Sequence, residues 1–198
     1  MRSAGFVLAN GAMSSNTSGE GKLRQKMIDK DLVDCMIALP GQLFYTTQIP
    51  VCLWFMTKNK KAVSIKKGKT QERRDRTGET LFIDARQMGT MISRVHKELT
   101  EEDLDRITTT YHSWRGQTAE GSYEDIAGYC KSATLEDIQK NDYVLTPGRY
   151  VGIAEEEDDG IPFEEKMRGL SAQLFEQMEK SSQLDTEIRS NLKVLGYE

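Results

Sequence analysis

The sequence is poor in the residues from which metal sites and disulfide frameworks are built. Its 198 residues include only two histidines and three cysteines. Cys35, Cys52 and Cys130 are widely and irregularly spaced, which argues against a disulfide framework, and neither histidine has a second ligand at metal-binding spacing. We therefore assign no metal ligand. Cys35 and Cys52 lie inside apolar runs and are interpreted as buried thiols.

Long apolar runs are also absent. The longest candidate, Ile49–Met56, is much shorter than the roughly 20 residues of a membrane-spanning helix. The first residues, Met1–Ala4, lack the apolar stretch of a signal peptide. Because 37% of the residues are hydrophobic and 29% are charged, the composition is typical of a soluble protein. We expect a cytoplasmic protein without a membrane partner.

The formal net charge of −4 conceals a basic segment and an acidic one. Between Lys58 and Thr77 there are nine lysines and arginines against two acids, and five consecutive acids occupy Glu155–Asp159. The basic segment either contacts DNA phosphates, which would make binding salt-dependent, or is a solvated, mobile insertion. The candidate phosphate contacts are Lys66, Lys67, Lys69, Arg73 and Arg74.

Hydrophobic patterning in the first third of the chain predicts an α/β fold. The continuous apolar run Gly5–Ala9 indicates a strand buried on both faces, as in a parallel sheet. Helical spacing over Glu20–Lys30 is followed by two buried strands, Leu32–Leu39 and Val51–Thr57. The first crossover should be right-handed and parallel. Since Pro40–Pro50 is too short for a crossover helix, the last two strands should pair antiparallel.

The middle of the chain is expected to be mainly helical. A short strand at Thr80–Ile83 precedes Asp84, which we expect to cap a helix over Met88–Leu99. A capping-box pattern at Thr100–Asp103 predicts a second helix that ends near Trp114. A further short helix is expected within residues 132–141. After it, Pro147 and Gly148 favour a turn.

The last segment carries apolar residues on one heptad seam. They are Phe163, Met167, Leu170, Leu174, Leu184, Ile188 and Leu195, interrupted by the polar Gln177, Ser181 and Asn191. This spacing predicts a long amphipathic, coiled-coil-like helix that needs a partner. The predicted segments are a sheet over 1–57, a basic flexible insertion over 58–79, a strand and helical region over 80–152, an acidic linker over 153–161 and the amphipathic helix over 162–198.

Four segments, in this order, resemble the methyltransferase subunit of type I restriction–modification systems. They are Gly5–Gly11, Leu39–Trp54, Asp142–Val151 and the terminal helix Pro162–Tyr197. The resemblance covers nearly the whole chain and identifies it as the C-terminal portion of such a subunit. It implies the end of a Rossmann-like sheet in an enzyme that methylates adenine N6 in DNA with S-adenosylmethionine. It also implies a specificity subunit as partner, and a restriction subunit in the full complex.

The catalytic and cofactor motifs of that family lie upstream of the segment that resembles this chain. The sequence contains no Asn-Pro or Asp-Pro pair, and its Gly-x-Gly, Gly19–Gly21, follows a polar loop. Without these motifs the chain cannot align adenine with the methyl donor. We therefore assign no catalytic or cofactor-binding residue and expect the isolated chain to be inactive and to bind S-adenosylmethionine weakly at most. The missing N-terminal half of the subunit is a further expected partner.

Two surfaces remain as functional candidates. Phe44 and Tyr45 lie in the Pro40–Pro50 loop, where enzymes of this type place an aromatic ring that stacks on the extruded base. The alternative is that Phe44 packs under the loop and Tyr45 faces solvent. The terminal helix either docks on the specificity subunit or is a solvated or self-associating coiled coil, and its docking residues would be Leu170, Leu174, Leu184, Ile188 and Leu195. The alternative function is a non-enzymatic remnant that binds a specificity subunit or DNA.

Overall fold

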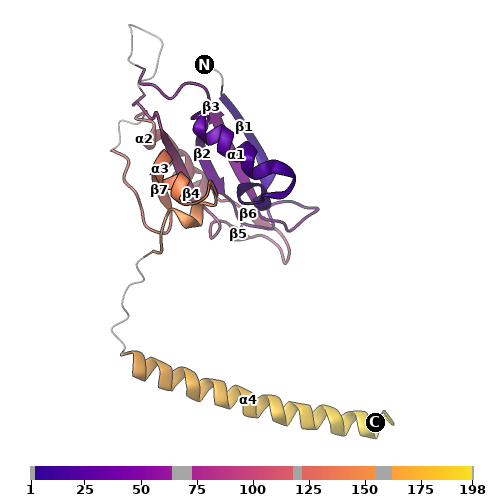
Figure 1. Ribbon diagram of the computed structural model, residues 1–198. Coiled ribbons are helices and arrows are strands. Elements are labelled where there is room, and N and C mark those ends of the chain that lie inside the picture. Colours follow the sequence, from indigo (N-terminus) through magenta and orange to yellow (C-terminus); the bar gives the residue numbers. More distant parts are fainter. Residues whose placement is uncertain (1–2, 64–72, 118–121, 155–161, 198) are drawn as a thin grey trace. The chain divides into compact units, whose positions relative to one another are not determined.

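The computed structural model describes residues 3–63, 73–117, 122–154 and 162–197 (Figure 1). Lys66, Lys67 and Lys69 lie outside the described residues. The chain divides into two units, residues 1–155 and 156–198, and each is described here by itself. No helix in the described part of the chain is both long and apolar enough to cross a membrane.

A mixed five-stranded sheet, in the order β1-β3-β2-β4-β7, forms the centre of the first unit among its described residues. The strands are β1 Ser3–Ala9, β2 Val33–Ala38, β3 Val51–Thr57, β4 Glu79–Asp84 and β7 Cys130–Thr134. β2 and β4 pair parallel, whereas β3 pairs antiparallel with both β1 and β2 and β7 pairs antiparallel with β4. β1 and β2 therefore run in the same direction with β3 between them. The antiparallel pairing of the last two strands and the common direction of β1 and β2 are confirmed, and the right-handed crossover stays a prediction.

Helices cover both faces of the sheet, which gives an α/β architecture in three layers (Figure 1). On one face, α1 (Glu20–Asp29) and α3 (Leu135–Lys140) contribute Ile28 and Ile138 to a core cluster. On the other face, α2 (Glu101–Trp114) contributes Ile107 and Trp114 to a second cluster. β2 serves both clusters because alternate side chains of a strand point to opposite faces, with Met36 in the first and Cys35 in the second.

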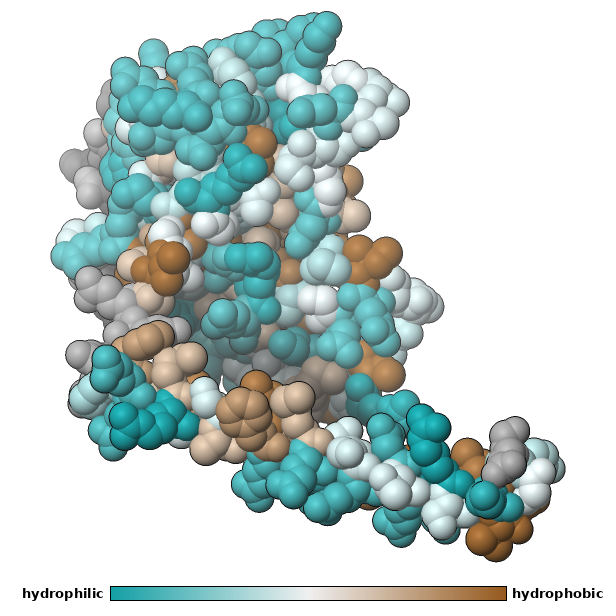
Figure 2. Space-filling view, turned by 60° about the horizontal axis from the view of Figure 1, so that its bottom comes forward, coloured by the Kyte–Doolittle hydropathy of each residue, from teal (hydrophilic) through white to brown (hydrophobic). Residues whose placement is uncertain are grey.

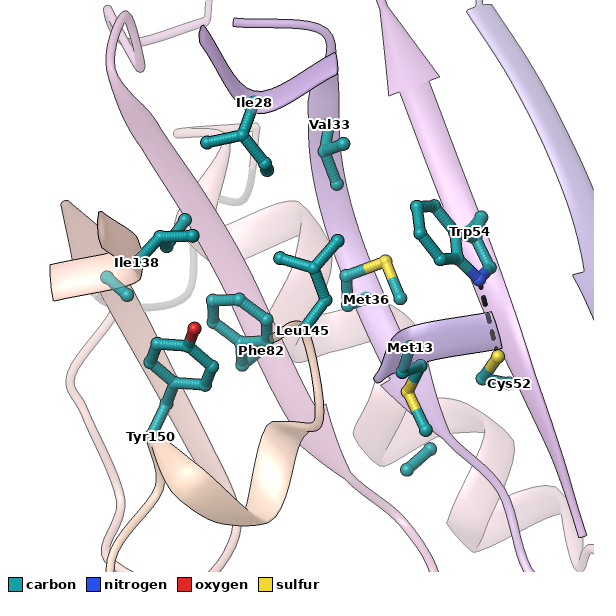
Figure 3. Close-up of a cluster of buried hydrophobic side chains, with 12 residues drawn as sticks. Met13, Ile28, Val33, Met36, Cys52, Trp54, Phe82, Ile138, Leu145 and Tyr150 are labelled. Carbon is teal, nitrogen blue, oxygen red and sulfur yellow. Dashed lines mark hydrogen bonds between the residues drawn. The ribbon is translucent and has the colours of Figure 1, made fainter. Parts of the chain in front are cut away.

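The turn near Pro147 packs against the first core cluster. The short helix η3 (Pro147–Arg149) leads to Tyr150, whose ring stacks on Phe82 with centroids 3.8 Å apart. The Tyr150 hydroxyl donates to the carbonyl of Val144 at 2.5 Å. Figure 3 shows this ring pair, and also the Trp54 indole, which donates to the Cys52 thiol at 3.3 Å. The turn that Pro147 and Gly148 predicted is present, and the packing of Tyr150 against the core holds it in place.

The expectation that Gly5–Ala9 is buried on both faces is wrong. The segment forms the edge strand β1, and every residue of β1 is exposed. Phe6, Val7 and Leu8 are 37%, 51% and 40% exposed. The two core clusters contain no residue of β1, because the helices pack over the central strands. The continuous apolar run predicted the strand correctly, but it did not predict whether other elements pack over its side chains.

The expected helix over Met88–Leu99 is also wrong. The segment forms a hairpin of β5 (Thr90–Met91) and β6 (Lys97–Glu98). Gly89 has a φ of +84°, a left-handed conformation that a helix does not accept. Asp84 does not cap a helix either: it accepts hydrogen bonds from the backbone and guanidinium of Arg86. The next helix, by contrast, begins as predicted, since Thr100 and Asp103 form the capping box of α2.

Helix α1 buries a cation that its sequence pattern did not predict to be internal. Arg24 is 2% exposed, whereas the neighbouring Leu23 is 58% exposed. The Arg24 guanidinium donates to the backbone carbonyls of Ala12, Ser15 and Tyr143 and to the side-chain oxygen of Asn16. It thereby fastens the segment that follows β1 to α1 without a carboxylate partner among these contacts.

The second unit consists mainly of α4 (Phe163–Val194). None of its described residues is buried. Figure 2 shows hydrophobic side chains exposed along this helix between hydrophilic ones. Of the predicted docking residues, Leu170, Leu174, Leu184 and Ile188 are 50–55% exposed, and Leu195, just beyond the helix end, is 69% exposed.

Candidate functional site

The candidate site lies at the edge of the sheet where the parallel strands end. Ligands of open α/β sheets bind outside the carboxyl ends of such strands. β1, β2 and β4 end at Ala9, Ala38 and Asp84. The chain segments that follow them are tied together by backbone hydrogen bonds, from Asn10 to the Pro50 carbonyl at 3.3 Å and from Ala85 to the Ala38 carbonyl at 2.9 Å. The three strand ends therefore present neighbouring loops.

The loop Pro40–Pro50 has a defined shape at this edge. The amide of Gln42 donates to the carbonyl of Gln48 at 3.3 Å, and Phe44 and Thr47 form a further bridge across the loop. A Cβ atom on Gly41 would lie 2.6 Å from the Gln48 carbonyl oxygen, so this close approach requires glycine. The loop is thus closed near its base and presents the tip Phe44–Thr47.

The two aromatic residues of this tip differ in exposure. Phe44 is 43% exposed and Tyr45 is 92% exposed, whereas the neighbouring Leu43 packs against the second core cluster. Leu43 therefore anchors the loop to the domain, and packing of Phe44 under the loop stays open as the alternative. Phe44 retains an accessible ring surface, so stacking on a base stays a prediction for it.

The hairpin β5–β6 supports this loop. The Lys97 amide donates to the Gln42 carbonyl at 2.9 Å, and the His96 ring stacks on the Tyr45 ring with centroids 4.4 Å apart and planes 15° from parallel. The Tyr45 ring thus lies beside His96 but remains largely exposed. This hairpin was not predicted from the sequence, where the segment was expected to be a helix. The glycine at position 89 and the β-branched Ile92 and Val95 were the available signals.

An ion pair at the end of β4 lies at the same edge of the sheet. Arg86 Nη2 lies 2.6 Å from Asp84 Oδ2, and the hydrogen bond to this carboxylate raises the pKa of the Arg86 guanidinium. A Cβ atom on Gly148 would lie 2.8 Å from that nitrogen, so the turn at Pro147–Arg149 approaches the end of β4 through its glycine. Two segments that carry the family resemblance, Leu39–Trp54 and Asp142–Val151, therefore both reach this edge of the sheet.

The described part of the basic segment lies at the opposite edge, where β3 ends and β4 begins. Arg74 donates to both carboxylate oxygens of Glu79, at 3.0 and 2.7 Å, and its guanidinium lies 5.1 Å from the centre of the Trp114 ring. The neighbouring Arg73 pairs with Val63 in a backbone bridge. Phosphate contact by Arg73 and Arg74 stays a prediction, and for Arg74 it competes with Glu79.

Two further cations of this segment are buried. Lys60 donates to Asp31 and to the Glu79 carbonyl, both at 2.6 Å, and burial lowers the pKa of its ammonium. Arg76, which is 1% exposed, pairs with the buried Asp34. These contacts fasten both ends of the segment to the sheet. Within the described part of the basic segment, the structure therefore does not bring Arg73 and Arg74 together with Phe44 and Tyr45.

The described residues do not fit an S-adenosylmethionine site. Gly19 and Gly21 enter α1 after the short helix η2 (Thr17–Gly19), so they do not form a glycine-rich turn at the end of a strand. The pocket beside them has a volume of about 480 Å³ and is lined by residues such as Lys22, Gln25 and Asp142. No group of three or more metal-binding side chains occurs within the described ranges. We assign no step of a reaction to a cofactor on this chain.

Comparison with known proteins identifies the family. The model of the N-6 DNA methylase family matches residues 2–159. This chain belongs to the N-6 DNA methylase family. It is 55% identical over 193 residues to the HindI type I restriction enzyme methylase subunit of Haemophilus influenzae, a match that covers 98% of this chain and 40% of the relative. It is 40% identical to the MjaIX methylase subunit of Methanocaldococcus jannaschii, of which it covers 32%. The resemblance to type I subunits is confirmed.

Solved structures of family members have the same fold. A type I methyltransferase subunit from Streptococcus thermophilus superposes with a TM-score of 0.57 at 26% identity, over 76% of this chain and 26% of that one. The EcoKI M protein gives a TM-score of 0.53 at 13% identity, over 78% of this chain and 35% of the other, a likeness of fold alone. This member of the N-6 DNA methylase family thus spans about two fifths or less of the length of these relatives.

Proposed function

We propose that this chain acts as a segment of a type I DNA adenine-N6 methyltransferase and supplies two parts of it. The first is the target-base loop, in which Phe44 stacks on the extruded adenine. The second is α4, which docks on the specificity subunit. S-adenosylmethionine binding and methyl transfer belong in this proposal to the complete enzyme, and a restriction subunit joins the full complex.

The match to the HindI methylase subunit carries this proposal. It extends over 98% of this chain but only 40% of that subunit, so a large part of the relative has no counterpart among these 198 residues. The sequence lacks an Asn-Pro pair to hold the adenine amino group. This combination supports a role that depends on residues supplied by another segment.

The exposed strand β1 supports contact with such a segment. Its apolar side chains Phe6, Val7 and Leu8 are 37–51% exposed, although the sequence pattern is that of a buried strand. An apolar edge strand with unpaired backbone groups is a template for pairing with a further strand. We expect the remainder of the Rossmann-like sheet to cover β1.

A complementation assay tests the proposal. The chain alone should transfer no tritiated methyl group to unmethylated DNA. Transfer should appear when the chain is mixed with a specificity subunit and with a family segment that carries the glycine and Asn-Pro-Pro-Phe motifs. Turnover by the chain alone would disprove the division of roles. No turnover in the complete mixture, despite assembly of its components, would disprove the methyltransferase role.

The exposed length of α4 favours a second function, a non-enzymatic docking module. A helix of 32 residues with no buried side chain among those described can bind a specificity subunit without any catalytic partner. The complementation assay separates the two functions. A docking module would co-purify with the specificity subunit but would not restore methylation.

A further inference from the structure

The candidate DNA surface at the carboxyl edge of the sheet is larger than the Phe44 loop. Residues Met91, Ile92 and Val95 of the β5–β6 hairpin are 48–55% exposed, and Arg94 between them is also exposed. Three exposed apolar side chains gathered at one hairpin indicate a candidate interaction surface, whereas single exposed ones are ordinary. Their sequence pattern predicted no functional role.

The hairpin and the loop form one continuous surface. The stacked rings of Tyr45 and His96 and the hydrogen bond between the Lys97 amide and the Gln42 carbonyl hold them together. The tip Ile92–Val95 is closed by the Ile92 amide, which donates to the His96 carbonyl at 3.0 Å. The hairpin therefore lies beside the loop that carries Phe44.

The charge of the hairpin favours a polyanion. Arg94 and Lys97 stand against Glu98, and within the described residues neither cation forms an ion pair. Among the described cations of the basic segment, Lys60, Arg74 and Arg76 are held in ion pairs at the opposite edge. Combined apolar and cationic side chains are what proteins insert beside an unstacked base step: the apolar residue fills the gap and the arginine meets the backbone.

We propose that the β5–β6 hairpin is a second DNA-contact element, which binds the duplex beside the extruded adenine. Arg94 contacts a phosphate, and Ile92 and Val95 pack against the bases next to the gap. His96 acts as a positioning residue, because its ring sets the place of the hairpin relative to the target-base loop. This inference rests on the proposed function and extends it to residues outside the loop.

The test uses a complete methylase subunit that carries this segment, purified with its specificity subunit. The methylated site is first mapped from plasmid DNA treated with the wild-type complex. A duplex with that site, and with 2-aminopurine in place of the target adenine, then serves as probe. Arg94→Ala should weaken binding several-fold and lower the slope of log affinity against log salt by about 1. The double variant Ile92→Ser, Val95→Ser should lose at least half of the fluorescence rise on base extrusion.

Lys140→Ala is the matched control, since Lys140 is an exposed cation at the end of α3, outside both the hairpin and the Pro40–Pro50 loop. It should leave the salt slope and the fluorescence unchanged. If the hairpin variants also behave as wild type while the complex methylates DNA, the hairpin proposal is wrong and the proposed function stands. If the variants lose the specificity subunit but any assembled complex binds DNA normally, the surface docks protein and the proposal is again wrong. A wild-type complex that methylates no DNA would overturn both.

Discussion

In the sheet domain, the apolar side chains of Trp54, Phe82 and Leu145 are at most 1% exposed, whereas in α4 those of Leu174 and Ile188 are both 55% exposed. Both regions carry the apolar pattern of a buried element, as nearly continuous apolar runs in the strands and as a heptad seam in the helix. Only the domain supplies covering layers, from α1, α2 and α3. The same apolar pattern therefore indicates a self-contained core in one region and an interaction surface in the other.

The largest expected effect is the loss of docking by α4. Leu174→Asp combined with Ile188→Asp places two charges in the apolar seam and should abolish co-purification with a specificity subunit, because a charge buried without a partner is strongly unfavourable. The control Ala172→Asp with Ser190→Asp puts the same charges on the opposite side of the helix and should co-purify normally. Normal stoichiometry for the seam variant would mean that α4 is not the docking element.

The next largest effect is on the free energy of unfolding of the sheet domain. Phe82→Ala removes a ring that is 0% exposed and stacked on Tyr150, and should lower the free energy of unfolding by about 3–5 kcal/mol. The matched control is Phe175→Ala in α4, where the ring is 68% exposed and the loss should be small. The only tryptophans, Trp54 and Trp114, are both in the domain, so their fluorescence in urea reports its unfolding separately from α4. Equal losses for the two variants would show that α4 is also packed.

Part of the fold could be predicted from the sequence. The starts of α1 and α2, the direction of β2 and β3, and the buried Cys35 and Cys52 followed from local patterns and caps. The exposure of β1 did not, because burial depends on which elements cover a strand. β7 was also missed, since Cys130–Thr134 has little apolar alternation and is fixed by pairing with β4.

The site was predicted only in part, for a similar reason. The Pro40–Pro50 loop could be recognised from its two prolines, its aromatic pair and the strands on either side. Its support could not, because the contact between Tyr45 and His96 joins residues 51 positions apart in the sequence. The basic segment was recognised from its composition, but composition does not reveal that Lys60 and Arg76 are buried beside acids of another strand and turn.

A smaller effect is expected from a substitution at the exposed tip of the Pro40–Pro50 loop. In a complete enzyme, Phe44→Ala should lower the methylation rate more than DNA affinity, because the loss of stacking costs about 1–3 kcal/mol in holding the extruded base. Phe44→Tyr keeps the aromatic ring and should restore most of the rate. If 2-aminopurine fluorescence and methylation both stay at the wild-type level in Phe44→Ala, the ring serves only the packing of the loop.

The smallest expected effect concerns the ion pair at the opposite edge of the sheet. The hydrogen bonds from Arg74 lower the pKa of Glu79, and Ser132 donates to the same carboxylate. Because the folded-state pKa is lowered, the stabilisation is fully present above the ordinary glutamate pKa of about 4.3 and is lost as the pH falls through the lower folded-state value. Glu79→Gln should therefore destabilise the domain at pH 7 by about 0.5–1 kcal/mol, since the pair is partly exposed to solvent.

The difference between wild type and Glu79→Gln should shrink as the pH falls below 4, because the wild-type carboxylate is then protonated as well. Urea unfolding followed by tryptophan fluorescence at several pH values between 7 and 3 measures it. The matched control is Glu124→Gln, an exposed glutamate outside the ion pairs of the described residues, which should change stability little at any of these pH values. A Glu79→Gln deficit that stays constant down to pH 3 would mean that the loss comes from altered packing around Trp114. The charge on Glu79 would then contribute nothing to fastening the basic segment.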